Sequence, residues 1–164
     1  GNPVVGAVAR AYRDKGYTTL RFNFRGVGRS EGHYAEGVGE QEDVRSAAAF
    51  LRDLGVDMMD LAGYSFGGWV NAAAADSIAG VRHLVMVSPP VDFMDFSFLK
   101  ENPKVALVIT GSRDDIASER TLRGLLPGWN PEADLQIIQG ADHFYMGKVG
   151  EIEKRIRSFL DGNM

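Results

Sequence analysis

The stretch "DLAGYSFGGWVNAAAA", Asp60 to Ala75, joins an apolar run to an alanine-rich run through one serine set between glycines. The run before Ser65 predicts a buried strand, and the run after it predicts a helix. Gly63 and Gly67 suit a sharp strand-to-helix turn, because side chains at either position would collide across so tight a connection. Ser65 therefore has two interpretations: a nucleophile exposed on a strained G-x-S-x-G turn, or a small residue in an ordinary connection.

Short β-rich runs alternate with segments of helical period on both sides of this turn. This order predicts an α/β fold with a mostly parallel open sheet and helices on both faces. The five expected strands are residues 17–24, 57–65, 83–89, 105–111 and 135–140. Five helices are expected around residues 4–12, 44–54, 66–80, 117–126 and 146–160. At 164 residues, we interpret residues 1–164 as a single domain.

The composition narrows the classes of function. A net charge of -4 gives no electrostatic case for binding nucleic acid or an anionic membrane. The absence of cysteine excludes disulfides, zinc-thiolate sites and a cysteine nucleophile. Because no apolar run reaches the length of a membrane span and the start does not resemble a signal peptide, we expect a cytoplasmic protein. The chain starts at Gly1 and not at a methionine, which is compatible with further residues upstream or with a cleaved leader.

The glycine-rich loop "RGVGRSEG" does not fit a dinucleotide-binding motif. Its third glycine, Gly32, comes one place later than G-x-G-x-x-G requires, and no helix begins there. The chain has no P-loop lysine motif, and its three histidines lack metal-ligand spacing. We therefore expect neither a cofactor nor a metal. Arg25 and Arg29 of this loop are candidates for contact with an acidic substrate, although solvated or structural roles are favoured for both.

A serine hydroxyl requires a base that is itself oriented by a carboxylate. Asp114 lies three residues beyond Gly111, where one expected strand ends, and His143 lies three residues beyond the next strand's last glycine, Gly140. Ser65, Asp114 and His143 thus follow the carboxyl ends of parallel strands, where open α/β sheets build their sites. Their chain order is also the order that this mechanism uses on this architecture.

Four segments together, "RFNFRGVGRSEG", "GYSFGG", "GSRDDI" and "ADHFY", resemble the α/β-hydrolase superfamily. The resemblance is closest to its small, nearly lidless serine hydrolases related to dienelactone hydrolase. It implies that Ser65 is the nucleophile, His143 the general base and acid, and Asp114 the orienting carboxylate. It also implies that the backbone N–H of Phe66 is one oxyanion donor.

The activity implied by the resemblance is hydrolysis of a small-molecule ester or related acyl substrate through an acyl-enzyme. A peptidase of the same fold is the enzymatic alternative. The alternative from another class is a non-catalytic protein that binds a ligand or a partner through the same cleft.

Several other residues compete for these roles. Asp115 could replace Asp114, but the G-x-x-D spacing favours Asp114. Asp142 is adjacent to His143 and is expected to point elsewhere. His83 opens an apolar strand and is expected to be packed or hydrogen-bonded, whereas His33 lies in the glycine-rich loop and is a weaker catalytic candidate.

The segment Pro89 to Pro103 occupies the place where larger relatives insert a lid. Its shortness favours small soluble acyl substrates over long lipids. Phe93, Met94, Phe96 and Phe98 either line an acyl pocket or pack beneath the segment, and packing is favoured. From this segment and the serine turn, the candidate substrate contacts are Tyr64, Phe93 and Phe96.

A complete member of the superfamily has three further strands ahead of the position of Gly1. The third lies between the strands expected at residues 17–24 and 57–65, and the loop after it supplies the second oxyanion N–H. We therefore expect an N-terminally incomplete domain: a fragment, a chain whose flanking strands pair directly, or a homo-oligomer in which another copy supplies the strand. Loss of one oxyanion donor costs about 3 kcal/mol of transition-state stabilisation.

Overall fold

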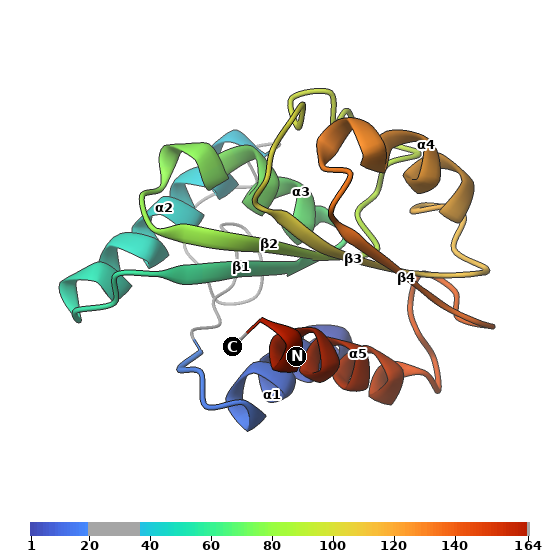
Figure 1. The fold of residues 1–164 in the computed structure, drawn as a ribbon, viewed down its shortest axis with the longest axis horizontal. Coiled ribbons are helices and arrows are strands. Elements are labelled where there is room, and N and C mark those ends of the chain that lie inside the picture. The colour runs from blue at the N-terminus through green and yellow to red at the C-terminus, as the bar shows by residue number, and fades with distance from the viewer. Residues whose placement is uncertain (20–36, 164) are drawn as a thin grey trace.

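The computed structural model describes residues 1–19 and 37–163, and these form a parallel sheet flanked by helices (Figure 1). The strands are β1 (Met59–Tyr64), β2 (Val81–Val87), β3 (Val105–Gly111) and β4 (Asp134–Ile138). They lie side by side in chain order, and each neighbouring pair is parallel. The expected α/β class is confirmed. The strand expected at residues 17–24 lies outside the described residues from position 20 onward, and residues 17–19 have no regular structure.

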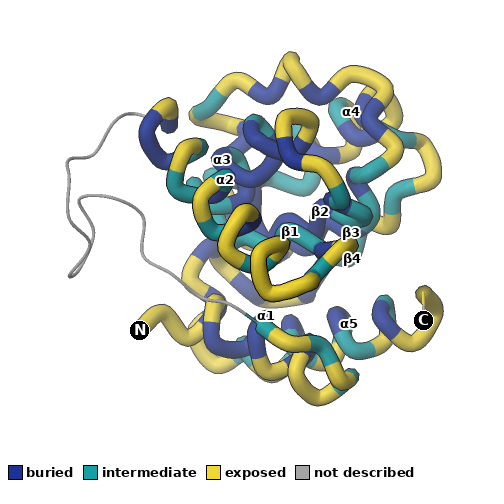
Figure 2. Tube along the Cα trace, turned by 90° about the vertical axis from the view of Figure 1, so that its left-hand side faces the viewer, coloured by how far each residue is buried: buried dark blue, intermediate teal, exposed yellow. Residues whose placement is uncertain are grey.

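Two layers of helices enclose the sheet (Figure 1). The helices are α1 (Pro3–Asp14), α2 (Val38–Asp53), α3 (Phe66–Ala74), α4 (Glu119–Trp129) and α5 (Val149–Gly162). α1 and α5 cover one face, and α2, α3 and α4 cover the other. Figure 2 shows buried positions in the sheet and on the inward helix faces, with exposed positions on the outer surfaces.

The central strands have apolar side chains on both faces, as their continuous apolar sequence predicts. On β2, Val85 and Val87 belong to the core beneath α1 and α5. Leu84 and Met86, which alternate with them, belong to the core beneath α2, α3 and α4. Each fully buried aliphatic side chain contributes about 1.5–3 kcal/mol through removal of apolar surface from water. β2 and β3 are thereby fixed between two apolar layers.

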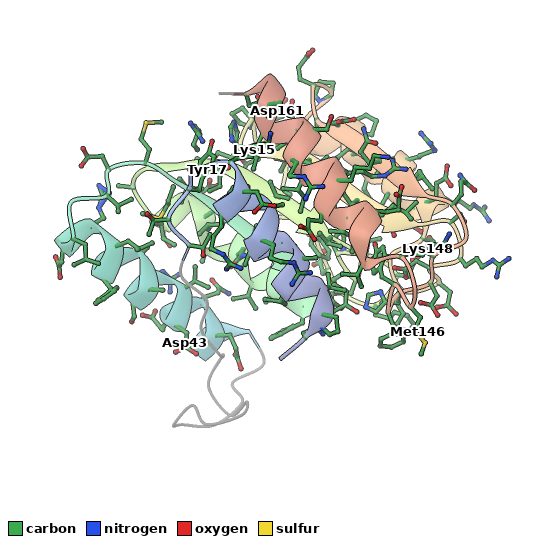
Figure 3. The ribbon with its side chains drawn as sticks, turned by 90° about the horizontal axis from the view of Figure 1, so that it is seen from below. Lys15, Tyr17, Asp43, Met146, Lys148 and Asp161 are labelled. Atoms are coloured by element: carbon green, nitrogen blue, oxygen red, sulfur yellow. The ribbon has the colours of Figure 1, made fainter. Side chains whose placement is uncertain are left out.

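Helices α1 and α5, from opposite ends of the chain, pack against each other below the sheet (Figure 3). Lys15 Nζ lies 2.6 Å from Asp161 Oδ1, and Arg10 Nε lies 3.3 Å from Glu153 Oε2. Exposed ion pairs of this kind contribute less than about 1 kcal/mol each. The packing of α1 against α5 therefore depends mainly on buried apolar side chains. These include Val4, Val8, Ala11, Ile152, Ile156 and Leu160.

The closing helix begins later than its apolar pattern predicts. The apolar spacing places Met146 on the same face as Val149, Ile152 and Ile156 of a helix over residues 146–160. Instead, α5 begins at Val149 and Met146 is 85% exposed. Positive φ angles of 56° at Tyr145 and 72° at Gly147 turn the chain just before the helix. The helix expected at residues 66–80 is also shorter than predicted, since α3 ends at Ala74 and a 3-10 turn (Ala75–Ser77) follows.

Among the described segments, no helix combines the length and the apolar character needed to cross a membrane.

One glycine allows a close approach between two loops at the carboxyl edge of the sheet. A Cβ at Gly111, the last residue of β3, would collide with the backbone carbonyl of Ala141. The approach is reinforced by the Arg113 N–H, which donates to the Ala141 carbonyl over 2.9 Å. Gly111 thus lets the loop after β3 lie against the loop after β4.

We expect Gly111→Ala to lower the free energy of unfolding by about 2 kcal/mol, because the added methyl group overpacks a backbone contact. Urea unfolding followed by circular dichroism measures this loss. The matched control is Gly124→Ala within α4, where no described atom beyond the chain neighbours and the helix's own backbone would lie within 4 Å of the new Cβ. That change should be neutral or raise the free energy of unfolding by up to about 1 kcal/mol. Equal stability of the two variants would contradict the prediction.

Candidate active site

Ser65 occupies a strained turn between β1 and α3. Its φ and ψ are 55° and -124°, a conformation that non-glycine residues rarely adopt. The Ser65 N–H donates to the Val87 carbonyl over 2.8 Å, which ties the turn to the end of β2. A Cβ at Gly63 would lie 2.7 Å from the backbone of Gly67. The turn therefore requires glycine on its strand side, and the strain at Ser65 favours the interpretation of this residue as a functional one.

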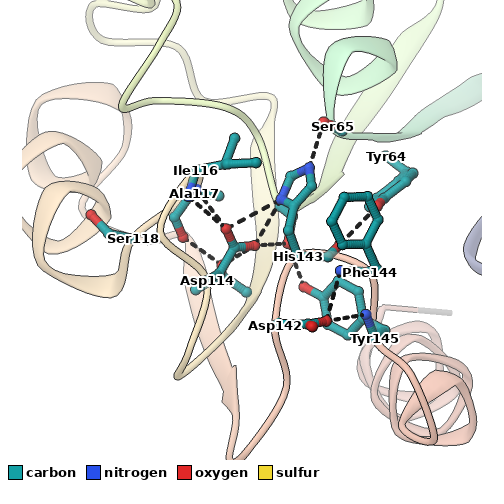
Figure 4. A network of polar contacts seen from close by, with 12 residues as sticks. Tyr64, Ser65, Asp114, Ile116, Ala117, Ser118, Asp142, His143, Phe144 and Tyr145 are labelled. Atoms are coloured by element: carbon teal, nitrogen blue, oxygen red, sulfur yellow. Dashed lines mark hydrogen bonds and ion pairs between the residues drawn. The ribbon is translucent and has the colours of Figure 1, made fainter.

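The imidazole of His143 lies between Ser65 and Asp114 (Figure 4). Ser65 Oγ is 2.8 Å from His143 Nε2, and His143 Nδ1 is 3.0 Å from Asp114 Oδ2. An ionised carboxylate only accepts, so Nδ1 carries the proton that it donates to Asp114. Nε2 is then left as the acceptor for the Ser65 hydroxyl proton. The structure thus brings together the three residues that the sequence singled out, in the order hydroxyl, imidazole, carboxylate.

The loop after β4 is shaped to present His143. Asp142 Oδ1 accepts the N–H groups of Phe144 and Tyr145 over 2.9 and 3.0 Å. The Tyr64 hydroxyl donates to the His143 carbonyl over 2.7 Å. Burial, and then the charges of Asp114 and Asp142, raise the pKa of Tyr64 to about 12, so its phenol stays protonated and can donate. The backbone of His143 is therefore held from both sides.

Asp114 has a fully buried side chain with several hydrogen-bond donors. Its Oδ1 accepts the N–H groups of Ile116 and Ala117 over 2.9 and 2.8 Å, and its Oδ2 accepts the Ser88 hydroxyl over 2.6 Å. Burial by itself would raise the pKa of this carboxyl. The hydrogen bonds from His143, Ser88 and the two N–H groups outweigh burial and lower the pKa to about 2. Asp114 is therefore charged at neutral pH.

The competing acidic and histidine candidates lie elsewhere. Asp115 is exposed, whereas Asp114 faces the imidazole. His83 Nδ1 lies 3.2 Å from Asp60 Oδ1, and its ring packs edge-on against Phe159. His83 is therefore both packed and hydrogen-bonded, as expected. His33, Arg25 and Arg29 lie outside the described residues.

The aromatic candidates differ in exposure. Phe96 is buried and packs on the ring of Trp129, with ring centroids 5.5 Å apart, whereas Phe93 is 74% exposed. Phe66 begins α3 and stacks on Trp69 at 6.1 Å. Packing beneath the segment is thus observed for Phe96, and roles of Tyr64, Phe93 and Phe96 in substrate binding stay predictions.

The sequence reasoning missed two polar groups of this site, Ser88 and Tyr145. Ser88 directly follows β2, and its hydroxyl contacts both Asp114 and the Tyr145 phenol. The available signal was its position, because Ser88 follows an apolar strand just as Ser65 does. Within residues 1–19 and 37–163, no cluster of three or more histidine or carboxylate side chains is arranged to hold a metal ion.

Known proteins resemble this chain along nearly its whole length. A family model described as "Alpha/beta hydrolase family" matches residues 3–153. The structure of an alpha-beta serine hydrolase homologue from Coxiella burnetii superposes with a TM-score of 0.89 at 31% identity, covering 98% of this chain and 77% of that one. A Xanthomonas campestris structure, described as a serine hydrolase of this type without lid, has a TM-score of 0.91 at 33% identity, covering 99% and 74%.

A relative among the curated proteins, an uncharacterised protein of Rickettsia prowazekii, is 35% identical over 173 residues. That match covers 98% of this chain and 73% of the relative. Each of these three proteins is thus matched by nearly the whole of this chain over about three quarters of its own length.

We expect Asp114→Asn to lower the free energy of unfolding at pH 7 by about 2 kcal/mol, because the folded pKa of Asp114 lies below the unfolded value of about 3.9. The stabilisation that comes from this lowered pKa is fully present above the unfolded pKa. It is lost as the pH falls toward the folded pKa of about 2. The difference between wild type and variant should therefore shrink between pH 4 and pH 2 in urea unfolding. Asp115→Asn, the same change on the neighbouring exposed carboxylate, should change the free energy of unfolding at pH 7 much less.

Proposed function

The chain belongs to the alpha/beta hydrolase family, and from that premise we propose that it is a serine hydrolase that cleaves small ester or related acyl substrates. The observation that supports this most is the line of hydrogen bonds from Ser65 through His143 to Asp114, with separations of 2.8 and 3.0 Å. A hydroxyl in contact with a carboxylate-oriented imidazole is the arrangement that activates serine for nucleophilic attack.

In the proposed reaction, Ser65 Oγ attacks the carbonyl carbon of the substrate while His143 Nε2 takes the hydroxyl proton. Asp114 stabilises the resulting imidazolium through the Nδ1–H. Negative charge develops on the carbonyl oxygen near the start of α3, where the Phe66 N–H is the proposed donor. His143 returns the proton to the leaving alcohol as the acyl-enzyme forms. Water, deprotonated by His143, then attacks the acyl-enzyme, releasing the acid and restoring Ser65.

The connection between β2 and β3 supports small substrates. Residues 88–104 join the two strands, and a relative of similar sequence is described as having no lid. Phe93 is well exposed, and so is Phe144, whose ring lies 5.5 Å from the His143 ring. Exposed aromatic side chains of this kind suit the apolar part of a short acyl group. We therefore place Phe93 and Phe144 among the proposed substrate contacts.

We expect a fluorophosphonate probe to label Ser65 covalently, with the site identified by mass spectrometry of peptides. His143→Ala should abolish labelling within the assay time, because the Ser65 hydroxyl then has no base. Ser65→Ala should abolish it because the nucleophile is gone.

Two variants serve as controls for this labelling. Ser112→Ala removes a hydroxyl that accepts the Gly140 N–H, and His83→Ala removes a second histidine that contacts a carboxylate. Both should be labelled like the wild type. A folded wild-type chain that takes no label would argue for the non-catalytic binding protein instead.

We expect p-nitrophenyl acetate and butyrate to be hydrolysed with higher kcat/KM than aminoacyl p-nitroanilides. The reason is that an ester leaving group departs more readily than an amine from the tetrahedral intermediate. Steady-state kinetics on both substrate series, with Ser65→Ala as the blank, measures the preference. A preference for the anilides would instead support a peptidase of the same fold.

A further inference from the structure

The end of β2 lies between the nucleophile and the acid and contacts both. On one side, the Val87 carbonyl accepts the Ser65 N–H over 2.8 Å. On the other side, the Ser88 hydroxyl donates to Asp114 Oδ2 over 2.6 Å. The Ser88 N–H donates to the Ile109 carbonyl of β3 over 2.7 Å, which fixes the Ser88 backbone in register. Two consecutive residues therefore link the serine turn to the carboxylate.

Ser88 is buried and its backbone conformation is strained. It is fully buried, and its φ of 48° lies in the left-handed region that favours glycine. Its hydroxyl lies 2.6 Å from Asp114 Oδ2 and 2.6 Å from the Tyr145 hydroxyl. A buried hydroxyl with two short polar contacts on a strained backbone is typical of functional sites.

The direction of each hydrogen bond follows from the charge on Asp114. The ionised carboxylate only accepts, so the single proton of Ser88 goes to Asp114. The Tyr145 hydroxyl must then donate to Ser88 Oγ. Burial raises the pKa of the Tyr145 phenol, and the charge of Asp114 adds to this effect. Together they outweigh the hydrogen bonds with Ser88 and Thr110, which lower the pKa, so the phenol keeps its proton. Thr110 Oγ1 does not replace Ser88, because it donates to the Ala117 carbonyl over 2.6 Å and lies 3.4 Å from Asp114 Oδ2.

We propose that Ser88 and Tyr145 are positioning residues that form a one-directional hydrogen-bond relay, Tyr145 to Ser88 to Asp114, which orients the carboxylate toward His143 and sets its basicity. This relay rests on the proposed function of the same site. It accounts for the orientation of Asp114: the Ile116 and Ala117 N–H groups fix Oδ1 and Ser88 fixes Oδ2. The side of the carboxylate that these donors leave open faces His143 Nδ1.

Removing the Ser88 hydroxyl leaves Asp114 Oδ2 with one donor fewer, so its negative charge acts more strongly on the imidazolium. We expect Ser88→Ala to lower kcat on p-nitrophenyl acetate about tenfold. KM should stay nearly unchanged, because the relay touches no substrate. The acid limb of the kcat/KM profile should move to higher pH by about half a unit.

Tyr145→Phe removes only the far donor and should cause a smaller loss of kcat and a smaller shift in the same direction. The double variant should come close to Ser88→Ala, because Ser88 gives the short connection from Tyr145 to Asp114, with contacts of 2.6 and 2.6 Å, whereas the path through Thr110 ends in a 3.4 Å contact. If Ser88→Ala does not fold, the shift in Tyr145→Phe decides the question. Unchanged kcat and acid limb in the folded single variants, or additive losses in the double variant, would overturn the relay.

Tyr12→Phe is the matched control, because Tyr12 is also buried and its hydroxyl donates to a carboxylate, Asp60, over 2.9 Å at the opposite end of β1. It should lose stability without change in kcat or in the acid limb.

A second readout does not depend on activity: the downfield ¹H NMR signal of the proton between His143 Nδ1 and Asp114 should move in Ser88→Ala and Tyr145→Phe, but not in Tyr12→Phe. A wild type that shows this signal but neither hydrolyses esters nor takes the probe would overturn the proposed function, and the signal shift would still decide the relay.

Discussion

The parallel register of the four described strands is the constraint on which the site depends. Parallel strands direct all their carboxyl ends to one edge, and here hydrogen bonds continue one residue beyond the strand end. The Ser65 N–H bonds to Val87, the Ser88 N–H to Ile109, and the Ser112 N–H to Ile138. A shift of one strand by a single residue would move its polar residue away from its partners. Residues remote in the sequence therefore meet because the ladder fixes where each strand ends.

Close backbone approach is the second requirement, and it explains why small residues surround the polar ones. Gly63 allows the strand and helix to meet at the serine turn, and Gly111 allows the two loops that carry Asp114 and His143 to touch. The polar residues themselves carry the strain: Ser65, Ser88 and Tyr145 all have positive φ. Strained residues of this kind persist only where surrounding contacts over-determine them. The buried strands and the ladder of hydrogen bonds supply that support.

Local pattern was enough to predict the fold class and the residues that meet. The spacing after Gly111 selected Asp114 over Asp115, because one residue of difference decides whether a side chain faces the loop after β4. The apolar periodicity failed as a guide at Met146, because the pattern begins three residues before the first residue of α5. Ser88 and Tyr145 were missed for another reason. The position of Ser88 after an apolar strand was a signal, but its contacts with Asp114 and Tyr145 depend on how β2 lies between β1 and β3, which no local pattern encodes.

The buried charge of Asp114 links stability to chemistry. A carboxylate with no exposed surface is costly unless donors satisfy it. Here the donors come from the loop 114–117, from the end of β2 and from the loop after β4, so each hydrogen bond that lowers the pKa of Asp114 also joins separate segments of the sheet edge. Because the Asp114 side chain is buried, the attraction between this charge and the His143 Nδ1–H is stronger than it would be in water. The packing that makes the carboxylate costly therefore also strengthens its hydrogen bond with His143.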